Sequence, residues 1–223
     1  MQSAPRTYRS PQRAADAART RERIVDAAAV LFVRHGYGAT AVKAIAGEAG
    51  VSVQSVHAAG PKSRLMLAAF ERSFAGDEGR HSLTERPALV AIIAEPDTST
   101  ALAAYARFLA DANQNAAGVW AAFRAAADAD PAVRELFDDL EERRARDMLL
   151  GAGWLASRRL AADADPQRIA DMLALITGPD TYLHFVRACG WTGEDYRAWV
   201  EASIRDLGRA VSALPLHPGA EGP

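Results

Sequence analysis

Three polar, uncharged side chains, Gln54, Ser55 and His57, lie within four residues and could form hydrogen bonds to another molecule. The surrounding stretch, residues 52–58, has the length of a short helix, and these three side chains would make its outer face polar without charge. Such a face is typical of side chains that contact base edges in a DNA groove, where glutamine can pair bidentately with adenine. The stretch is therefore a candidate recognition helix.

A second short helix should position this one. Thr40 is a suitable N-cap, and Gly50 can adopt the left-handed conformation that ends a helix. Ser52 follows as the N-cap of the next helix. Between Thr40 and Gly50 the apolar residues recur at helical spacing: Val42, Ile45, Ala46 and Ala49. Two helices with a tight turn predict a helix-turn-helix, although the same pattern occurs in helical proteins that bind no DNA.

Residues 20–37, TRERIVDAAAVLFVRHGY, predict an amphipathic helix that ends at Gly36 and completes a three-helix core. The combined stretch resembles the DNA-binding domain of the tetracycline-repressor (TetR) family. The resemblance is carried by the pattern R-x-x-I-x-x-A-A-x-x-L-F-x-x-x-G-Y followed by T-x-x-x-I-A-x-x-A-G-V-S. The matching residues are Arg21, Ile24, Ala27, Ala28, Leu31, Phe32, Gly36, Tyr37, Thr40 or Ala41, Ile45, Ala46, Ala49, Gly50, Val51 and Ser52.

The sequence departs from the family pattern at the end of the recognition helix. His57 stands where the family usually has Tyr, the Phe three residues later is absent, and Lys62 comes one residue early. In the family, the Tyr contacts a phosphate and the Phe packs the recognition helix onto the next helix. We therefore interpret the departure as a one-residue deletion that changes how the recognition helix is seated.

The expected DNA contacts divide into two kinds. Gln54 and Ser55 should contact bases, and phosphates should be contacted by Thr40, Lys43, His57 and Lys62. Ser52 and Val53 begin the recognition helix and belong to the same interface. Charge supports this placement, because eleven basic and five acidic residues up to Arg72 give +6, whereas the remainder carries −8 within a total of −2.

Composition limits the other functions. The 223 residues are 49% hydrophobic, no apolar run approaches the roughly 20 residues of a bilayer span, and a membrane partner is not expected. Cys189 is the single cysteine, so no disulfide can form within the chain, and a cytoplasmic location is predicted. The usual phosphate-binding, zinc and nucleophile motifs are absent, and the five histidines lack ligand spacing. We expect no cofactor, no metal, no catalytic residue and no enzyme activity.

The predicted fold is all-α, with four parts: a flexible basic arm at 1–18, a helix-turn-helix domain at 19–76, a helical ligand-binding and dimerisation domain at 77–215, and a disordered tail at 216–223. In the helix-turn-helix domain, a fourth helix follows Pro61. The third part should contain helices at about 99–115, 118–128, 131–157, 166–177, 180–188 and 192–213.

The C-terminal pattern L-x-x-P-x-x-Y-x-x-x-V-x-x-x-G-W-x-x-x-x-Y-x-x-W resembles the ligand-binding domain of a large TetR subgroup. Its residues here are Leu175, Pro179, Tyr182, Val186, Gly190, Trp191, Tyr196 and Trp199. In the family, the last two helices form a four-helix dimer interface. The residues expected there are Tyr182, Phe185, Val186, Trp199, Val200, Ile204 and Leu207, although their spacing would equally suit a monomer core.

Aromatic residues on apolar helix faces are the candidates for the ligand site, although most such residues are core. Asn113 and Arg124 are more informative, because a polar group on an apolar face needs a partner. The expected ligand-binding residues are Tyr105, Phe108, Asn113, Trp120, Phe123, Arg124 and Trp154.

Taken with the resemblance, these residues imply a homodimeric repressor that a small-molecule effector releases from a palindromic double-stranded operator. Two alternatives remain open from the sequence. One is a helical module for ligand or protein binding that has lost strong DNA binding. The other is a helical-bundle enzyme.

Overall fold

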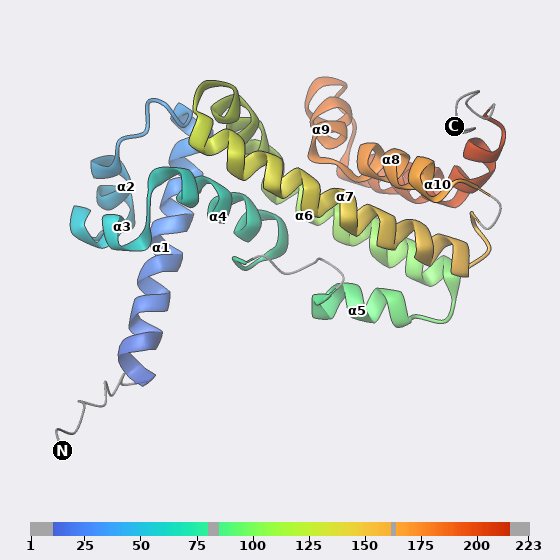
Figure 1. Cartoon of the computed structure of the whole chain (residues 1–223), viewed down its shortest axis with the longest axis horizontal. Helices are drawn as coiled ribbons and strands as arrows, with labels where there is room; N and C mark the ends of the chain where they lie inside the picture. The colour runs from blue at the N-terminus through green and yellow to red at the C-terminus, as the bar shows by residue number, and fades with distance from the viewer. Residues whose placement is uncertain (1–10, 80–84, 162–163, 215–223) are drawn as a thin grey trace, which may run out of the picture.

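The computed structural model describes residues 11–79, 85–161 and 164–214, and within these residues the chain forms helices and no strand (Figure 1). The all-α prediction is confirmed. The whole of the predicted C-terminal tail and the first ten residues of the predicted arm lie outside the described residues.

The N-terminal part consists of α1 (Pro11–His35), α2 (Val42–Ala49), α3 (Val53–Ala59) and α4 (Lys62–Ala75). α1 already begins at Pro11, so residues 11–18, which the sequence analysis assigned to the flexible basic arm, are helical in the structure. Proline is tolerated in the first turn of a helix, where its missing N–H would have no partner, and the alanines that follow favour helix. The helices predicted at 52–58 and after Pro61 are confirmed.

Thr40 does not cap α2 as expected. The N-cap is Ala41, and Thr40 is only 2% exposed. Its hydroxyl donates to the carbonyl oxygen of Gly36 at 2.7 Å. The hydroxyl therefore provides a hydrogen-bond partner for a carbonyl just after α1, and not for an amide in the first turn of α2. With this hydroxyl turned into the protein, the predicted phosphate contact of the Thr40 side chain is wrong as well.

Two long antiparallel helices, α6 (Thr98–Ala129) and α7 (Pro131–Ser157), extend from the N-terminal helices to the far end of the molecule, with α5 (Pro87–Ala94) beside them (Figure 1). The prediction of two helices at 99–115 and 118–128 is wrong, because α6 is continuous through Gly118. A Cβ atom at Gly118 would lie 3.3 Å from Cγ1 of Val33. This glycine therefore allows α1 to approach α6 closely and does not end a helix.

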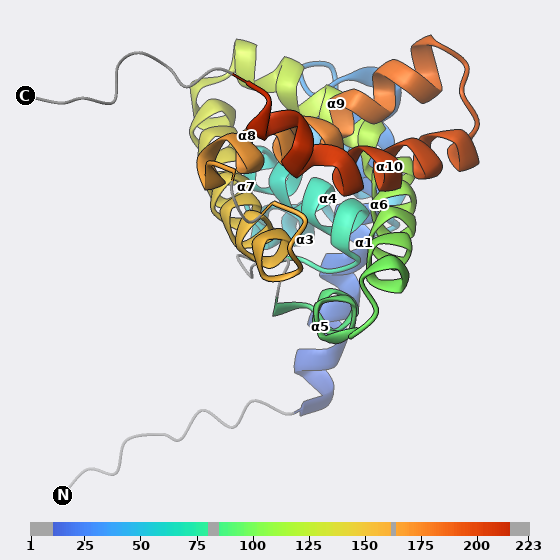
Figure 2. The same cartoon turned by 90° about the vertical axis from the view of Figure 1, so that its right-hand side faces the viewer.

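The C-terminal part contains α8 (Pro166–Thr177), α9 (Pro179–Tyr182), a π-helical segment (Leu183–Ala188) and α10 (Gly193–Ser212). Thr192 caps α10 as predicted, and the side chain of Asp195 completes a reciprocal capping box. Figure 2 looks onto α8 and α10, which pack on each other at the end of the molecule opposite α3.

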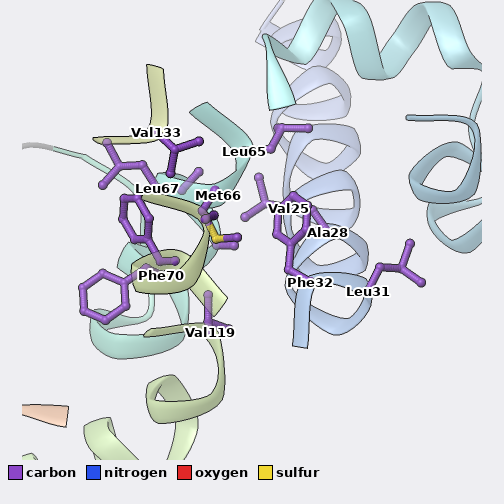
Figure 3. Packing of buried hydrophobic residues seen from close by; sticks show 14 of the residues in the cluster. Val25, Ala28, Leu31, Phe32, Leu65, Met66, Leu67, Phe70, Val119 and Val133 are labelled. Carbon is purple, nitrogen blue, oxygen red and sulfur yellow. The ribbon is translucent and has the colours of Figure 1, made fainter. Parts of the chain in front are cut away.

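One hydrophobic core crosses the predicted domain boundary at residue 76. It joins α1 and α4 to α6 and α7, as Figure 3 shows for residues such as Val25, Phe70 and Val133. The ring of Phe70 on α4 lies 5.2 Å from that of Trp120 and 6.4 Å from that of Phe123, both on α6. The helix-turn-helix part is thus packed directly onto the helices that follow it.

A second core lies between α6, α7, α8 and α10, and it takes up much of the predicted dimer interface. Tyr182, Val200, Ile204 and Leu207 are each at most 4% exposed within a single chain. Their assignment to a dimer contact is wrong, because their apolar spacing faces the chain's own helices. Phe185, Val186 and Trp199 are only partly buried.

Candidate nucleic-acid interface and ligand cavity

The recognition helix α3 exposes one face and anchors the other. Val53, Gln54 and His57 are exposed, whereas Val56 is 1% exposed and belongs to the first core. Ser52 caps the helix as predicted, since its Oγ accepts from the amide of Ser55 at 3.0 Å. The two hydroxyls of Ser52 and Ser55 lie 2.9 Å apart. The exposed face is polar and uncharged apart from Val53, whose apolar side chain suits a thymine methyl group.

The turn between α2 and α3 is fixed by Gly50 and by an arginine of α1. Gly50 has φ 62° and ψ 42°, a left-handed conformation that glycine adopts without strain. Arg23 donates through Nη2 to the carbonyl oxygen of Ala49 at 2.5 Å and to that of Gly50 at 3.2 Å. Carbonyls at a helix end lack partners within the helix, so this guanidinium stabilises the turn.

A second arginine of α1 performs the same role at the end of α3, where the family's Phe is missing. Nη1 of Arg21 donates to the carbonyl oxygen of Ala59 at 2.5 Å, and Ala59 itself packs partly buried against the first core. The seating of the recognition helix therefore relies on a hydrogen bond and a small side chain. The sequence shows Arg21, but not that it reaches across to residue 59.

Lys62 begins α4 and is tied to the turn after α1. Its Nζ donates to the carbonyl oxygens of Tyr37 at 2.9 Å and Thr40 at 3.2 Å, and it lies 4.1 Å from the centroid of the Tyr37 ring. The Tyr37 hydroxyl donates to Asp130 at 3.3 Å. Burial and the nearby Asp130 carboxylate raise the pKa of Tyr37 to about 12. Lys62 thus has a structural role beside its predicted phosphate contact.

Two basic side chains remain open to solvent around this surface. Lys43 on α2 is exposed, as a phosphate contact requires. Arg64 on α4 is exposed too, and its Cβ lies 3.9 Å from the position that a Cβ of Gly60 would occupy, next to the end of α3. Sequence reasoning missed Arg64, although a basic residue in the first turn of the helix after the recognition helix was the available signal.

A largely apolar cavity lies between α5, α6, α7, α8 and α10. It holds about 660 Å³, its open mouth included. Of the predicted ligand residues, Tyr105 and Trp154 line it, together with the carboxylate-bearing side chain of Asp147. Burial, and secondarily the Asp147 carboxylate, raise the pKa of Tyr105, which keeps this phenol a neutral hydrogen-bonding group. The remaining lining residues are Leu89, Ile92, Ile93, Met148, Leu150, Gly151, Leu155, Leu173 and Ile204.

The end of α5 is held over this cavity by α7. Trp154 donates through Nε1 to the carbonyl oxygen of Ile93 at 3.3 Å, and Arg158 donates to the same oxygen at 3.0 Å. Arg158 also donates to the carbonyl oxygens of Glu95 and Pro96. These contacts cap the C-terminus of α5, and no sequence motif indicated them.

The other predicted ligand residues do not line the cavity. Trp120 and Phe123 are 2% and 0% exposed in the first core, and Phe108 packs edge-on against Phe74 with centroids 6.4 Å apart. Asn113 and Arg124, also predicted to bind the ligand, lie away from this cavity and have partners within the chain.

Asn113 is fully buried, and its amide nitrogen donates to the carbonyl oxygen of Thr177 and to the hydroxyl of Tyr196, both at 3.1 Å. Arg124 forms an exposed ion pair with Asp180 at 2.5 Å. Neighbouring helices thus supply partners for the amide nitrogen of Asn113, whereas its Oδ1 is buried and accepts no hydrogen bond within the described residues.

Within the described part of the chain, no three His, Cys, Asp or Glu side chains gather as a metal site would require. Among the described helices, none combines the length and the apolar character needed to cross a membrane.

A helix-turn-helix with an exposed recognition helix, packed onto a helical part that contains an apolar cavity, has the architecture of a DNA-binding regulatory protein. Residues 24–59 match the model of the bacterial regulatory proteins of the tetR family, which identifies this segment as a TetR-type helix-turn-helix domain and supports a TetR-like transcriptional regulator. The matched segment contains the C-terminal half of α1 and all of α2 and α3.

No curated protein matches the chain. Among solved structures, a proposed transcriptional regulator from Pseudomonas aeruginosa PAO1 is similar with a TM-score of 0.65 and 20% identity, over 91% of this chain and 94% of that one. Another, from Saccharomonospora viridis in complex with choline, is similar with a TM-score of 0.63 and 18% identity, over 84% of this chain and 96% of that one. At these identities the similarity shows the shared fold.

Proposed function

We propose that the chain is a repressor that binds a palindromic operator as a homodimer and is released by a small molecule. The observation that carries this proposal is the recognition helix: Gln54 and His57 are exposed on α3, while Val56 fixes the opposite face in the core. Gln54 would read a base, and the exposed Lys43 and Arg64 would contact phosphates on either side. We infer that the protein acts by binding alone, in the bacterial cytoplasm where its operator is.

Dimerisation is proposed because one recognition helix of seven residues reads only a half-site. The two-fold axis would lie at α8 and α10, as the resemblance to the family implies. Leu175 on α8 is 64% exposed, and Phe185, Val186 and Trp199 remain partly exposed in one chain. These four apolar side chains are the ones that a partner subunit would cover, in place of the buried residues of α10.

The effector would occupy the cavity lined by Tyr105, Asp147 and Trp154. Its walls favour a mostly apolar molecule, and the Tyr105 hydroxyl and Asp147 carboxylate are the groups that would fix its orientation. The Saccharomonospora viridis neighbour in complex with choline supports a small molecule as the effector class. An effector that binds the non-DNA conformation more tightly lowers operator affinity, and the operator lowers effector affinity reciprocally.

The test is selection of duplexes from a random pool by the full-length protein, followed by titration of the selected duplex. We expect a palindrome whose half-sites are separated by one helical turn, about 34 to 36 Å, or a multiple of it. Affinity for the selected duplex should fall with rising salt as phosphate contacts are screened. Failure to enrich any sequence, with binding to all duplexes alike, would refute the proposal. Choline is the first effector probe, with Trp154→Ala as the cavity variant.

A further inference from the structure

The end of the recognition helix is connected to the segment that follows α4. Besides its hydrogen bond to Ala59, Arg21 binds the carboxylate of Glu78 through Nε at 2.9 Å and through Nη2 at 2.6 Å. One guanidinium thus joins the last residue of α3 to a residue beyond α4. Because an isolated helix of this length is unstable in water, α3 depends on such tertiary contacts.

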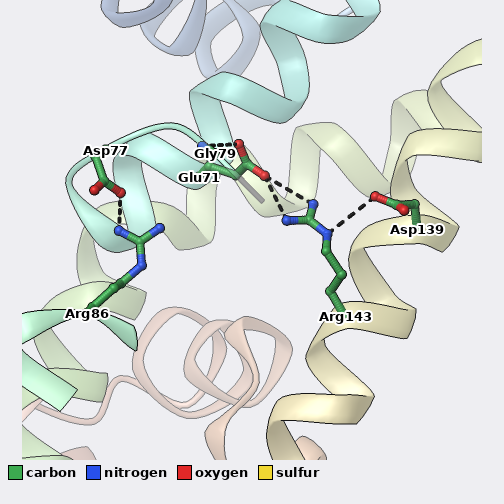
Figure 4. Close-up of polar contacts among 6 residues, drawn as sticks. All are labelled: Glu71, Asp77, Gly79, Arg86, Asp139 and Arg143. Carbon is green, nitrogen blue, oxygen red and sulfur yellow. Dashed lines mark hydrogen bonds and ion pairs between the residues drawn. The ribbon is translucent and has the colours of Figure 1, made fainter. Parts of the chain in front are cut away.

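The segment after α4 is in turn fixed to α7 by a buried ion pair (Figure 4). The amide of Gly79, next to Glu78, donates to Oε2 of Glu71 at 3.0 Å. The other oxygen, Oε1, accepts from both Nη atoms of Arg143 at 3.0 Å each. Asp139 lies 3.3 Å from Nε of the same arginine. The side chains of Glu71 and Arg143 are only 10% and 15% exposed.

Burial makes this ion pair sensitive to small displacements. Two charges that have left water are stabilised only while their geometry stays good, and separating them leaves an uncompensated charge in the interior. The ion pair would therefore strongly oppose a small shift of α7 relative to α4. Once the shift has separated the two charges, the pair would no longer hold the two helices together. Such a contact has two states, which coupling between distant sites requires.

Arg143 also lies on the helix that forms the cavity wall. Asp147 follows it by one turn of α7, and Gly151 and Trp154 continue the same wall. A molecule that fills the cavity and displaces this part of α7 would move Arg143 with it, because a helix transmits displacement along its length.

We propose that the pair formed by Glu71 and Arg143 is the contact through which occupation of the cavity is communicated to the recognition helix. Displacement of α7 separates Arg143 from Glu71, which frees Gly79 and Glu78, and Arg21 then holds Ala59 less firmly. Glu71, Arg143 and Arg21 are thus positioning residues for DNA binding. This inference rests on the proposed regulation by a ligand in the cavity.

The test replaces the unidentified effector by a side chain grafted into the cavity. A Cβ at Gly151 would lie 3.4 Å from Cδ1 of Leu173, an ordinary contact, so Gly151→Leu should fold and extend into the cavity. Gly153→Leu is the matched control, because residue 153 is exposed on the same helix and a Cβ there has no neighbour within 4 Å. Both changes are made in the natural protein and in the double variant Glu71→Gln with Arg143→Met, which removes both charges together.

Hydrogen exchange of the α3 amides is the first measurement, with the α10 amides as the reference for global unfolding. We expect Gly151→Leu to accelerate α3 exchange about tenfold in the natural background, and to weaken binding of the selected duplex by a similar factor. Gly153→Leu should change neither. In the double variant, α3 exchange should already be fast, and Gly151→Leu should add nothing. Arg143→Lys, which keeps the charge, should retain part of the response to Gly151→Leu.

A polar contact elsewhere on α7 tests whether the coupling is specific. Tyr37→Phe removes the hydrogen bond to Asp130, the N-cap of α7, and should leave the response to Gly151→Leu intact. An equal response to Gly151→Leu with and without the ion pair would overturn the inference, as would an unchanged α3 exchange in the natural background. Exchange needs no DNA, so failure of the protein to select a duplex would refute the proposed function and leave this result standing.

Discussion

Gly208 on α10 provides a sharp test of the packing around the second core. A Cβ atom at this position would lie 1.8 Å from the carbonyl oxygen of Leu160 and 2.7 Å from Cα of Ala161. Non-bonded atoms in contact are about 3.5 Å apart, so Gly208→Ala forces the 160–161 turn and α10 apart by more than an ångström. Backbone atoms cannot relieve this overlap by changing a rotamer.

The magnitude follows from two opposing effects. Overpacking of this severity costs about 3 kcal/mol, at the upper end of the usual range. Replacing a helical glycine by alanine stabilises the helix by about 1 kcal/mol. The net loss of about 2 kcal/mol should lower the melting temperature by about 4 to 8 °C, measured by circular dichroism at a fixed protein concentration.

The same substitution at Gly153 serves as the control, because a Cβ there has no neighbour within 4 Å. Gly153→Ala should raise the melting temperature by about 2 to 4 °C, since only the helix-propensity gain applies. The reasoning is refuted if both variants shift the melting temperature in the same direction. Comparable thermal unfolding of Gly208→Ala and the natural protein would show that α10 does not approach the 160–161 turn this closely.

Three further outcomes follow from the structure. Gln54→Ala should relax base preference at one position of each half-site, by about 1 to 3 kcal/mol in competition titrations, whereas Lys43→Ala should weaken all duplexes alike and reduce the salt dependence. Burial raises the pKa of Tyr196 to about 12, so the stability that its neutral form contributes is complete below pH 10 and is lost as the pH rises through 12. The free energy of unfolding of the natural protein should therefore fall by about 2 kcal/mol more between pH 9 and pH 12 than that of Tyr196→Phe, measured by urea unfolding at both pH values. Leu175→Glu should convert a dimer to a monomer in light scattering at micromolar concentration, and an unchanged mass would locate the interface elsewhere.

The helix-turn-helix was predictable from sequence because its determinants are local. Ser52 bonds an amide three residues away, and Gly50 adopts the conformation that glycine alone enters freely. The prediction that Thr40 caps α2 was wrong because rules based on neighbouring residues do not include tertiary contacts. Its hydroxyl had two possible partners, the start of α2 and the end of α1, and the tertiary packing selected the carbonyl of Gly36.

Gly118 illustrates the same limit in α6. A glycine within an apolar helical pattern predicts a break when only the neighbouring residues are considered. Here it marks the crossing point of Val33, some eighty-five residues earlier in the chain, and the helix continues. The signal in the sequence was real, but its cause was a contact between distant elements.

Apolar periodicity likewise identifies a buried face without identifying what covers it. On α10, Val200, Ile204 and Leu207 recur at the spacing that a dimer interface and an internal core share, and the chain's own helices cover them. Leu175 is a single exposed leucine in a helix whose other apolar residues are mostly buried, so its spacing carried no distinct signal. What separates a core residue from an interface residue is therefore exposure in the folded chain. The sequence indicated Tyr105 and Trp154 of the cavity, but not the contribution of α5, because the C-terminal end of α5 is held in place by contacts with the distant Trp154 and Arg158.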